Sequence, residues 1–280
     1  MSENEVCWAF NKEERGIKIT ETFKQHSLGT LKLFRASFSY IIPILNYRYS
    51  KYIGEIDEDT VRKSVEIGVA LHDIGKTSKN YTESYTGHEL YSGYQIYKIL
   101  EECCDSGLKA IVSIAAMSHH QAMVNRTLKE HILKGGYEEI RDYELREECI
   151  KDISDVLKEI GVNIDAKNII QPYITRDDVY EWFINMDLEV NNNLNFYTII
   201  VGPLMIVDTI VANMNRGGGT SHLIKNSLKW IEIDKKRGKI SYQKLYSDCI
   251  KRENNEESCE KEATNKLIEE IKEVIKINNK

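Results

Sequence analysis

Apolar residues recur at steps of three and four along much of this 280-residue chain, and only three prolines interrupt it. This period is typical of amphipathic helices. Three such series are Leu31, Phe34, Phe38, Ile41 and Leu45; Val61, Val65 and Val69; and Leu108, Ile111, Val112 and Ala115. Asp57 and Ser221 each precede a helical stretch, where their side chains suit N-cap positions. The sequence therefore predicts an all-α fold.

The chain shows no internal repeat and no composition shift that marks a domain boundary, so we expect a single domain over residues 1–280. Its core is expected to span about 20–125 and 195–235. The more polar segment at about 126–194 is predicted to be a peripheral helical insertion. A C-terminal extension at about 236–280 mixes acidic and basic residues at helical spacing, which indicates a solvated amphipathic helix.

Charge and cysteine content narrow the class of protein. The net charge of −6 argues against strong unaided nucleic-acid binding. The longest apolar run, Ile199–Ala212, is too short to span a bilayer and contains Asp208, so it is predicted to be a buried helix and not a membrane span. The six cysteines form no CxxC pair, and the adjacent Cys103 and Cys104 are poor disulfide partners. Reduced thiols and a cytoplasmic location are therefore expected.

The sequence Leu71–His72–Asp73–Ile74–Gly75–Lys76 is the strongest local signal of chemistry. A His-Asp pair arises often by chance. Here, however, His72 follows the inward face marked by Val69, and Gly75 is expected to stop the helix. An inward carboxylate needs a partner, because burying it unpaired is costly. A metal ion would satisfy both side chains.

Further candidates occur at predicted helix ends or inside apolar runs. They are His26, His88, His119, His120 and Asp208. Any one of these histidines alone is more often a hydrogen-bonded core residue than a ligand. The joint pattern changes that balance, because five of the seven histidines fall at helix ends or on inward faces. The other two, His131 and His222, have ordinary helix-terminal contexts.

Five imidazoles and two carboxylates exceed what one tetrahedral ion needs. Ligands of this type without cysteine suit Mn, Fe, Co or Ni, and Mg less well. Two ions bridged by Asp73 would be an economical arrangement. The first ion would take His26, His72, Asp73 and Asp208; the second would take Asp73, His88, His119 and His120.

The order His … His-Asp … His … His-His … Asp resembles the HD superfamily of metal-dependent phosphohydrolases. More narrowly, it resembles the stand-alone HD nuclease subunit of type I CRISPR interference. The Asp73-to-Lys76 spacing and the tandem His119–His120 point to that branch. The match covers about the first 120 residues well and the region of Asp208 more loosely, so Asp187 remains an alternative last ligand.

The resemblance implies an HD-domain helical bundle that hydrolyses phosphodiester bonds of single-stranded DNA at a two-metal site. It also implies two partners: a separate CRISPR helicase subunit, and a crRNA-guided surveillance complex that supplies the displaced strand. Such a chain needs only a local groove, which fits its acidic net charge.

Roles follow for individual side chains. Asp73 and Lys76 are the catalytic candidates, with Lys76 offsetting charge on the phosphoryl oxygens. From spacing alone, an ordinary surface salt bridge is an equal alternative for Lys76. Arg126 and Arg216 are candidates for guiding the phosphate backbone.

Other functions remain open at this point. A nucleotide or cyclic-nucleotide phosphohydrolase would use the same scaffold around an enclosed pocket. A catalytically silent HD scaffold would have lost ligand residues. A helical interaction protein would use its histidines only for structure and would bind no metal.

Overall fold

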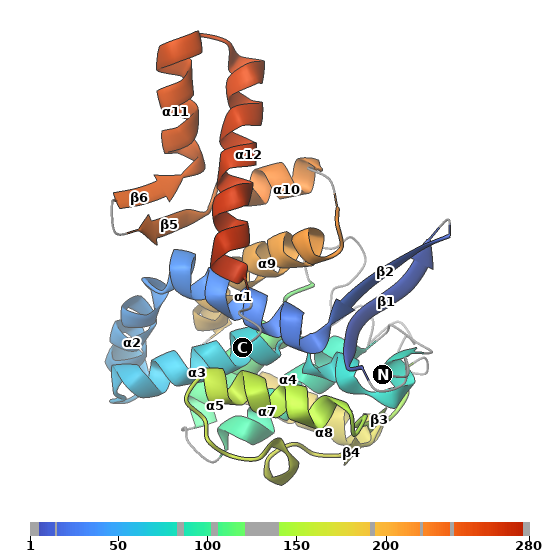
Figure 1. Cartoon of the computed structure of the whole chain (residues 1–280). Helices are drawn as coiled ribbons and strands as arrows, with labels where there is room; N and C mark the ends of the chain where they lie inside the picture. The colour runs from blue at the N-terminus through green and yellow to red at the C-terminus, as the bar shows by residue number, and fades with distance from the viewer. Residues whose placement is uncertain are drawn as a thin grey trace.

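The computed structural model describes residues 6–14, 16–82, 87–101, 106–120, 140–190, 194–218, 221–235 and 238–276. The fold is all-α, as predicted (Figure 1). Its helices are α1 (Phe23–Phe38), α2 (Ile41–Tyr52), α3 (Glu58–Leu71), α4 (His88–Leu100), α5 (Ser106–Met117), α7 (Cys149–Glu159), α8 (Arg176–Val190), α9 (Leu194–Asn215), α10 (His222–Leu228), α11 (Tyr242–Glu253) and α12 (Glu256–Ile275). Short 3-10 turns are η2 (Ile74–Thr77), η3 (Lys79–Thr82) and η5 (Ala166–Asn168).

Among the described residues, three small pairs of antiparallel strands, which the helical periodicity did not predict, accompany the helices. They pair β1 (Trp8–Glu14) with β2 (Ile17–Thr22), β3 (Tyr143–Glu144) with β4 (Tyr173–Ile174), and β5 (Glu232–Lys235) with β6 (Gly238–Ser241). In the first hairpin Trp8 lies opposite Thr22 and Glu14 opposite Ile17. Strand β2 leads directly into α1, so the first hairpin sets where the first core helix begins.

Helix α1 lies at the centre of the core and packs against α3, α7, α9 and α12. Its Leu31, Leu33 and Phe34 are buried almost completely. Burying each such side chain contributes about 1.5–3 kcal/mol to folding. Helix α5 packs against α3, α4 and α9, so the five helices α1, α3, α4, α5 and α9 converge on one region.

Polar caps fix where several helices start. Thr22 and Gln25 form a capping box at α1, in which Gln25 N–H donates to Thr22 Oγ1 over 3.1 Å. The two N-caps predicted from the sequence are confirmed: Asp57 accepts from Thr60 N–H at α3, and Ser221 accepts from Ile224 N–H at α10.

The apolar series from Leu31 to Leu45 was predicted as one helix, and this prediction is wrong. The chain bends by 79° between α1 and α2. Pro43 lies in the first turn of α2, where its missing N–H leaves no helical bond unmade. A straight helix would instead place the Pro43 ring against the Ser39 carbonyl, so the helix ends before it.

The apolar run Ile199–Ala212 lies within α9, a helix of 22 residues. Within the described residues, α9 is long and apolar enough to cross a membrane, and the bent pair α1–α2 would pass the same test only if counted as one span. Core helices pass that test too. Helix α9 packs against α1, α5 and α10, and it carries the buried Asp208.

The expectation that all cysteines are reduced is wrong for four of the six. Cys7 is bonded to Cys149, and Cys249 to Cys259. The first pair lies 142 residues apart in sequence, so no local spacing could indicate it. Cys103 and Cys104 lie outside the described residues. The expected cytoplasmic location therefore loses its argument from cysteine spacing.

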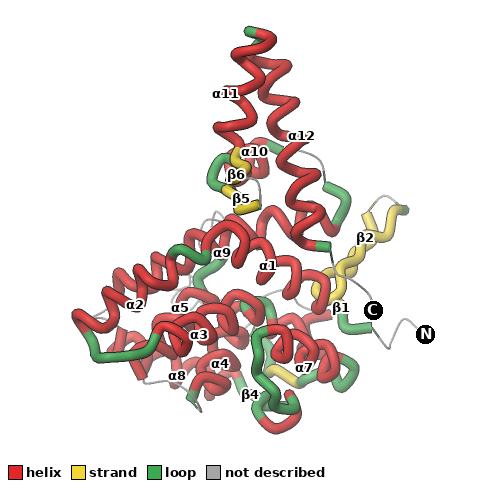
Figure 2. The backbone as a smooth tube through the Cα atoms, turned by 60° about the vertical axis from the view of Figure 1, so that its left-hand side comes forward, coloured by secondary structure: helices red, strands yellow, loops and turns green. Residues whose placement is uncertain are grey.

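Helices α11 and α12 run side by side and stand away from the helical body (Figures 1 and 2). The Cys249–Cys259 disulfide joins them. Helix α12 also returns to pack against α1, through buried Leu267 and Ile271. The segment predicted as a solvated extension is thus partly a core element.

Candidate metal centre

The seven predicted ligands come from five helices and meet in one place. His26 lies in the first turn of α1, and His72 caps the end of α3. Asp73 begins η2, and His88 is the first residue of α4. His119 and His120 follow the end of α5, and Asp208 lies inside α9; all seven are buried.

The side chains form two groups that could each hold one ion. His26, His72, Asp73 and Asp208 form the first, and Asp73, His88, His119 and His120 form the second; within each group the ligand atoms lie within 4.8 Å of one another. We call these the first and second clusters. Asp73 belongs to both.

Asp73 directs one carboxylate oxygen to each cluster. Its Oδ2 lies 3.2 Å from His26 Nε2 and 3.7 Å from His72 Nε2. Its Oδ1 lies 3.4 Å from both His88 Nε2 and His119 Nε2. This is the arrangement of a bridging carboxylate.

The separations fit metal coordination. Two ligand atoms that each lie about 2.1 Å from one ion are separated by roughly 3.0–3.4 Å in octahedral or tetrahedral geometry. His26 Nε2 lies 3.1 Å from Asp208 Oδ1, and His72 Nε2 lies 3.5 Å from the same oxygen. Small shifts would bring these atoms onto a common ion.

The hydrogen bonds of the imidazole rings also support metal binding. His72 Nδ1–H donates to Val69 O over 2.8 Å, and His119 Nδ1–H donates to Ala116 O. These bonds fix the tautomer, so in the neutral rings Nε2 carries a lone pair toward the cluster. His26 Nε2 and His72 Nε2 are 3.2 Å apart, and two lone pairs at that distance repel unless a metal ion or a proton lies between them.

Buried polar atoms that lack hydrogen-bond partners also support a metal site here. Asp73 Oδ1 and His119 Nε2 have no hydrogen-bond partner among the described residues. Such orphaned atoms are rare in a folded interior and call for an explanation. The donor set, with imidazole and carboxylate and no thiolate, fits divalent Mn, Fe, Co or Ni.

The pKa values show that the site favours positive charge. Burial tends to raise the pKa of Asp73, but the Lys76 and His72 charges outweigh it and hold this pKa well below its usual range. Burial tends to lower the pKa of His26, yet Glu21 and the carboxylates raise it well above its usual value. Burial and its imidazole neighbours lower the pKa of His120 instead, so that ring stays neutral and able to bind a metal.

Glu21 supports the first cluster from behind, and the sequence did not indicate it. Its Oε1 accepts from His26 Nδ1 over 2.8 Å and from Asn215 Nδ2 over 2.7 Å. Its Oε2 accepts from Arg216 Nε over 2.8 Å. A carboxylate behind a ligating imidazole fixes the ring and raises its basicity. Glu21 lies on a strand, so no helical pattern linked it to His26.

The predicted substrate-side residues lie in different environments. Lys76 is buried, and its Nζ donates to Asp73 Oδ2 over 2.5 Å, so it is not a surface salt bridge. Arg216 pairs with Glu21 and stacks over the Phe10 ring, 4.2 Å from its centroid. Arg126 and the side chain of Asp187 lie outside the described residues.

The close approach of η2 to α4 brings Asp73 toward His88. A Cβ at Gly75 would lie 2.0 Å from His88 O, so no larger residue fits without backbone movement. Gly75 N–H donates to Ser92 Oγ on the same helix over 2.9 Å. Gly75 therefore acts in packing as well as in ending the preceding helix.

A small cavity adjoins His88, with a volume of about 10 Å³ among the described residues. It is lined by Gly75, Ser78, Asn80, Tyr81, His88, Tyr91 and Arg141. That volume holds about one water molecule. Within the described part of the chain this cavity gives no support to an enclosed nucleotide pocket.

Comparison with known proteins finds a relative by sequence and a similar solved structure. No protein-family model matches the chain. The CRISPR-associated endonuclease Cas3-HD of Methanocaldococcus jannaschii is 26% identical over 187 residues, which cover 58% of this chain and 75% of that protein. Among solved structures, the CRISPR-associated Cas3 HD domain protein of the same organism aligns with a TM-score of 0.47 and 22% identity, over 67% of this chain and 95% of that chain. The chain is thus homologous to Cas3-HD and resembles the HD-domain CRISPR-associated nucleases.

Proposed function

We propose that the chain is a metal-dependent nuclease that cleaves single-stranded DNA in CRISPR interference, with two divalent ions bound in the first and second clusters. The observation that carries this proposal is the position of Asp73, whose two carboxylate oxygens face the two clusters separately. The sequence match to Cas3-HD supports the nuclease class.

Bound ions would acidify a water molecule and stabilise charge on the phosphoryl oxygens during in-line displacement. The chain's own residues orient this chemistry. Asp73 would hold both ions at a fixed separation, and Glu21 would keep His26 Nε2 directed at the cluster. Lys76, held by Asp73 Oδ2, would place its positive charge beside the transferred phosphoryl group.

The partners proposed for this chain are those that its resemblance to the HD nucleases of CRISPR interference implies, and its charge is compatible with them. With a net charge of −6 it is poorly suited to capture a polyanion alone. A separate helicase subunit and a crRNA-guided surveillance complex, acting in the cytoplasm, would deliver the strand to the metal centre. Arg126 and Arg216 are proposed to guide the backbone; Arg216 would do so from its place beside Glu21.

All seven candidate ligands are present and gathered, which favours an active enzyme over a silent scaffold. A chain whose histidines served only structure would pair protonated Nε2–H groups with these carboxylates and would retain no metal. The metal content of the purified protein separates these readings first.

The experiment is cleavage of end-labelled single-stranded DNA by metal-stripped protein, with Mn, Co, Ni or Mg added back. Asp73→Asn keeps the shape of the side chain and should lose both cleavage and metal retention. His222→Ala is the matched control, because His222 is exposed, lies outside both clusters and is hydrogen-bonded to the neighbouring Asn226. We expect it to behave as the wild type.

The outcomes separate the alternatives. Metal-dependent cutting that disappears in Asp73→Asn supports the proposal. Hydrolysis of nucleotides or cyclic nucleotides without DNA cleavage would replace it with a small-molecule phosphohydrolase. Wild-type cleavage by Asp73→Asn would overturn the role of the bridging carboxylate.

A further inference from the structure

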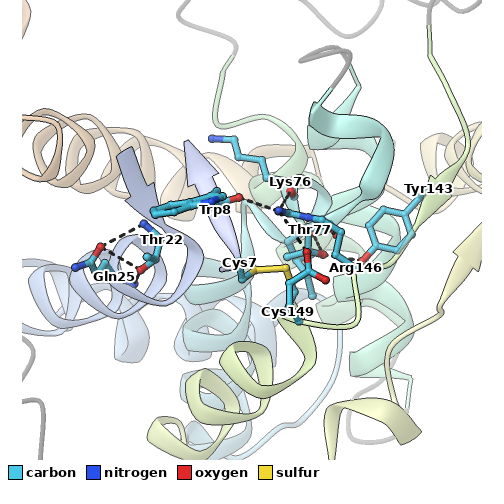
Figure 3. Close-up of a disulfide and its surroundings, with 11 residues drawn as sticks. Cys7, Trp8, Thr22, Gln25, Lys76, Thr77, Tyr143, Arg146 and Cys149 are labelled. Carbon is cyan, nitrogen blue, oxygen red and sulfur yellow. Dashed lines mark hydrogen bonds and ion pairs between the residues drawn. A yellow bond between two sulfur atoms is a disulfide. The ribbon is translucent and has the colours of Figure 1, made fainter. Parts of the chain in front are cut away.

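Arg146 is a buried cation that is held by backbone carbonyls (Figure 3). Its Nη2 donates to Lys76 O and to Trp8 O, each over 2.9 Å, and its Nε donates to Thr77 O over 3.3 Å. The Glu148 carboxylate lies 4.0 Å from Nη1. Burial lowers the pKa of this guanidinium, so its charge is kept at a cost.

Two of the three carbonyls that Arg146 holds, those of Lys76 and Thr77, belong to the turn that follows the bridging residue Asp73. Asp73 is the N-cap residue of turn η2, and Lys76 N–H donates to Asp73 O over 2.9 Å. The carbonyl of Lys76 bonds Arg146, while its Nζ bonds Asp73 Oδ2. One residue therefore connects the guanidinium to the bridging carboxylate.

Neighbouring bonds strengthen this attachment. Arg146 N–H also donates to Thr77 O over 3.0 Å, and the Thr77 and Tyr143 hydroxyls are hydrogen-bonded over 2.8 Å. Ser78 forms a β-bridge with Leu145. The segment Tyr143–Arg146, which we call the brace, thus runs along the end of η2.

A neutral side chain could fill the same space without the cost of desolvation. The feature that only arginine supplies is a rigid fork of donors that holds several carbonyls at fixed separations. That feature is useful where the position of the turn matters, as it does for a carboxylate shared between two ions.

The Cys7–Cys149 disulfide fixes the third carbonyl of this network. Cys7 precedes Trp8, and Cys149 lies three residues after Arg146, so the disulfide and the hydrogen bond from Arg146 to Trp8 O join the same two segments of the chain (Figure 3). Phe23 N–H donates to Cys7 O over 2.8 Å at the start of α1, which carries His26. The disulfide is therefore linked to the start of α1 through Phe23 and to turn η2 through Trp8 and Arg146.

We propose that Arg146 is a positioning residue for Asp73, and that the Cys7–Cys149 disulfide makes the metal affinity of the centre depend on the redox state of this pair. The inference rests on the proposed metal centre. Reduction by a phosphine and water would break the S–S bond, add two electrons and two protons to give two thiols, and leave the phosphine oxide. Trp8 O would then lose its tether to the brace.

The test is Co²⁺ binding to metal-stripped protein. Titration gives the affinity, and the visible d–d spectrum of the bound ion reports its ligand geometry. Arg146→Met should weaken binding about 10-fold or more and alter the spectrum, since supporting residues around metal ligands typically contribute 10- to 100-fold to affinity. Arg146→Lys keeps the charge but not the fork, so it should restore only part of the affinity. The spectrum reports ligand geometry, which a loss of general stability in a folded variant would leave unchanged.

The second disulfide supplies a matched control. In Cys249→Ser/Cys259→Ser protein, Cys7–Cys149 is the one of the two described disulfides that remains. After reduction by a phosphine and removal of the reagent by gel filtration, the Co²⁺ affinity of this protein should fall. In Cys7→Ser/Cys149→Ser protein the affinity should already be low, and reduction should change it no further. Cys103 and Cys104 are common to both proteins.

Each outcome decides the inference. Unchanged Co²⁺ affinity and spectrum in folded Arg146→Lys and Cys7→Ser/Cys149→Ser proteins would overturn it, even if Arg146→Met fails to fold. An equal loss on opening either disulfide would overturn the redox part. If the wild type binds no Co²⁺, the proposed metal centre itself fails, which distinguishes the two cases.

Discussion

Glu21→Gln should weaken metal binding without touching any ligand. Glu21 is fully buried and accepts three hydrogen bonds, from His26, Asn215 and Arg216, over 2.7–2.8 Å. The glutamine amide has one acceptor oxygen and two N–H donors. If its oxygen still faces His26 Nδ1, its NH₂ group faces Arg216 Nε, and two donors meet.

The size of the effect follows from these contacts. An imidazole that loses the carboxylate behind it becomes less basic and less well oriented, which costs about 10- to 100-fold in metal affinity. That range corresponds to about 1.4–2.7 kcal/mol. The buried mismatch at Arg216 should also lower the free energy of unfolding by about 1–3 kcal/mol. Glu21 reaches the centre through His26, so the first cluster should be affected most.

The assay is equilibrium dialysis against chelator-buffered Mn²⁺, with bound metal counted by atomic emission. At a free Mn²⁺ concentration that just fills the wild type, Glu21→Gln should bind less metal, and a 10- to 100-fold higher concentration should refill it. Glu66→Gln is the control, because Glu66 is also buried and pairs with an arginine, Arg35, over 2.6 Å. Wild-type affinity in Glu21→Gln, or an equal loss in Glu66→Gln, would refute the reasoning.

Three further results are expected. Gly75→Ala should destabilise the protein by about 3 kcal/mol or more in urea unfolding, because the new Cβ would clash with the His88 carbonyl. Gly54→Ala is the control and should leave the stability unchanged, because a Cβ there meets nothing within 4 Å. Metal-stripped protein should lose stability as the pH falls below about 4. The pKa values of Asp73 and Asp208 in the folded protein are well below those of the unfolded chain. Their ionised carboxylates therefore stabilise the fold above the unfolded-state pKa, and this contribution is lost as the pH falls toward the folded-state pKa. Urea unfolding at pH 6 and pH 3 would show this, and a smaller difference is expected in Asp73→Asn. Adding a chelator should lower the melting temperature of the metal-loaded wild type but not of Asp73→Asn, since an ion at 100 times its Kd contributes about 2.7 kcal/mol.

The sequence was sufficient to place the candidate ligands because each lies at a helix end or within an apolar helix. His72 and His119 illustrate this: both follow the last turn of a helix, where one imidazole nitrogen reaches back to a backbone carbonyl and the other points onward. Helical periodicity and glycine positions reveal such places. Their gathering in one centre was expected from the joint pattern and the resemblance to the HD superfamily, and the structure brings them together.

The supporting residues could not be found in the same way. Glu21 and Arg146 act through partners far away in sequence, and Cys7 meets Cys149 only after the chain has folded. Each of these contacts depends on tertiary packing and has no periodic or spacing signal. The break before α2 was different: Pro43 was visible in the sequence, but the apolar spacing continues across it and outweighed it.

The composition of the metal centre also determines at which stage of synthesis the chain can first bind metal. His26 comes from the first core helix and Asp208 from α9, yet their Nε2 and Oδ1 atoms lie 3.1 Å apart. Contacts so distant in sequence form late, because loop-closure entropy opposes them until intervening helices have packed. A nascent chain still on the ribosome before α9 emerges lacks this ligand. Synthesis past Asp208 is therefore the step that completes the first cluster.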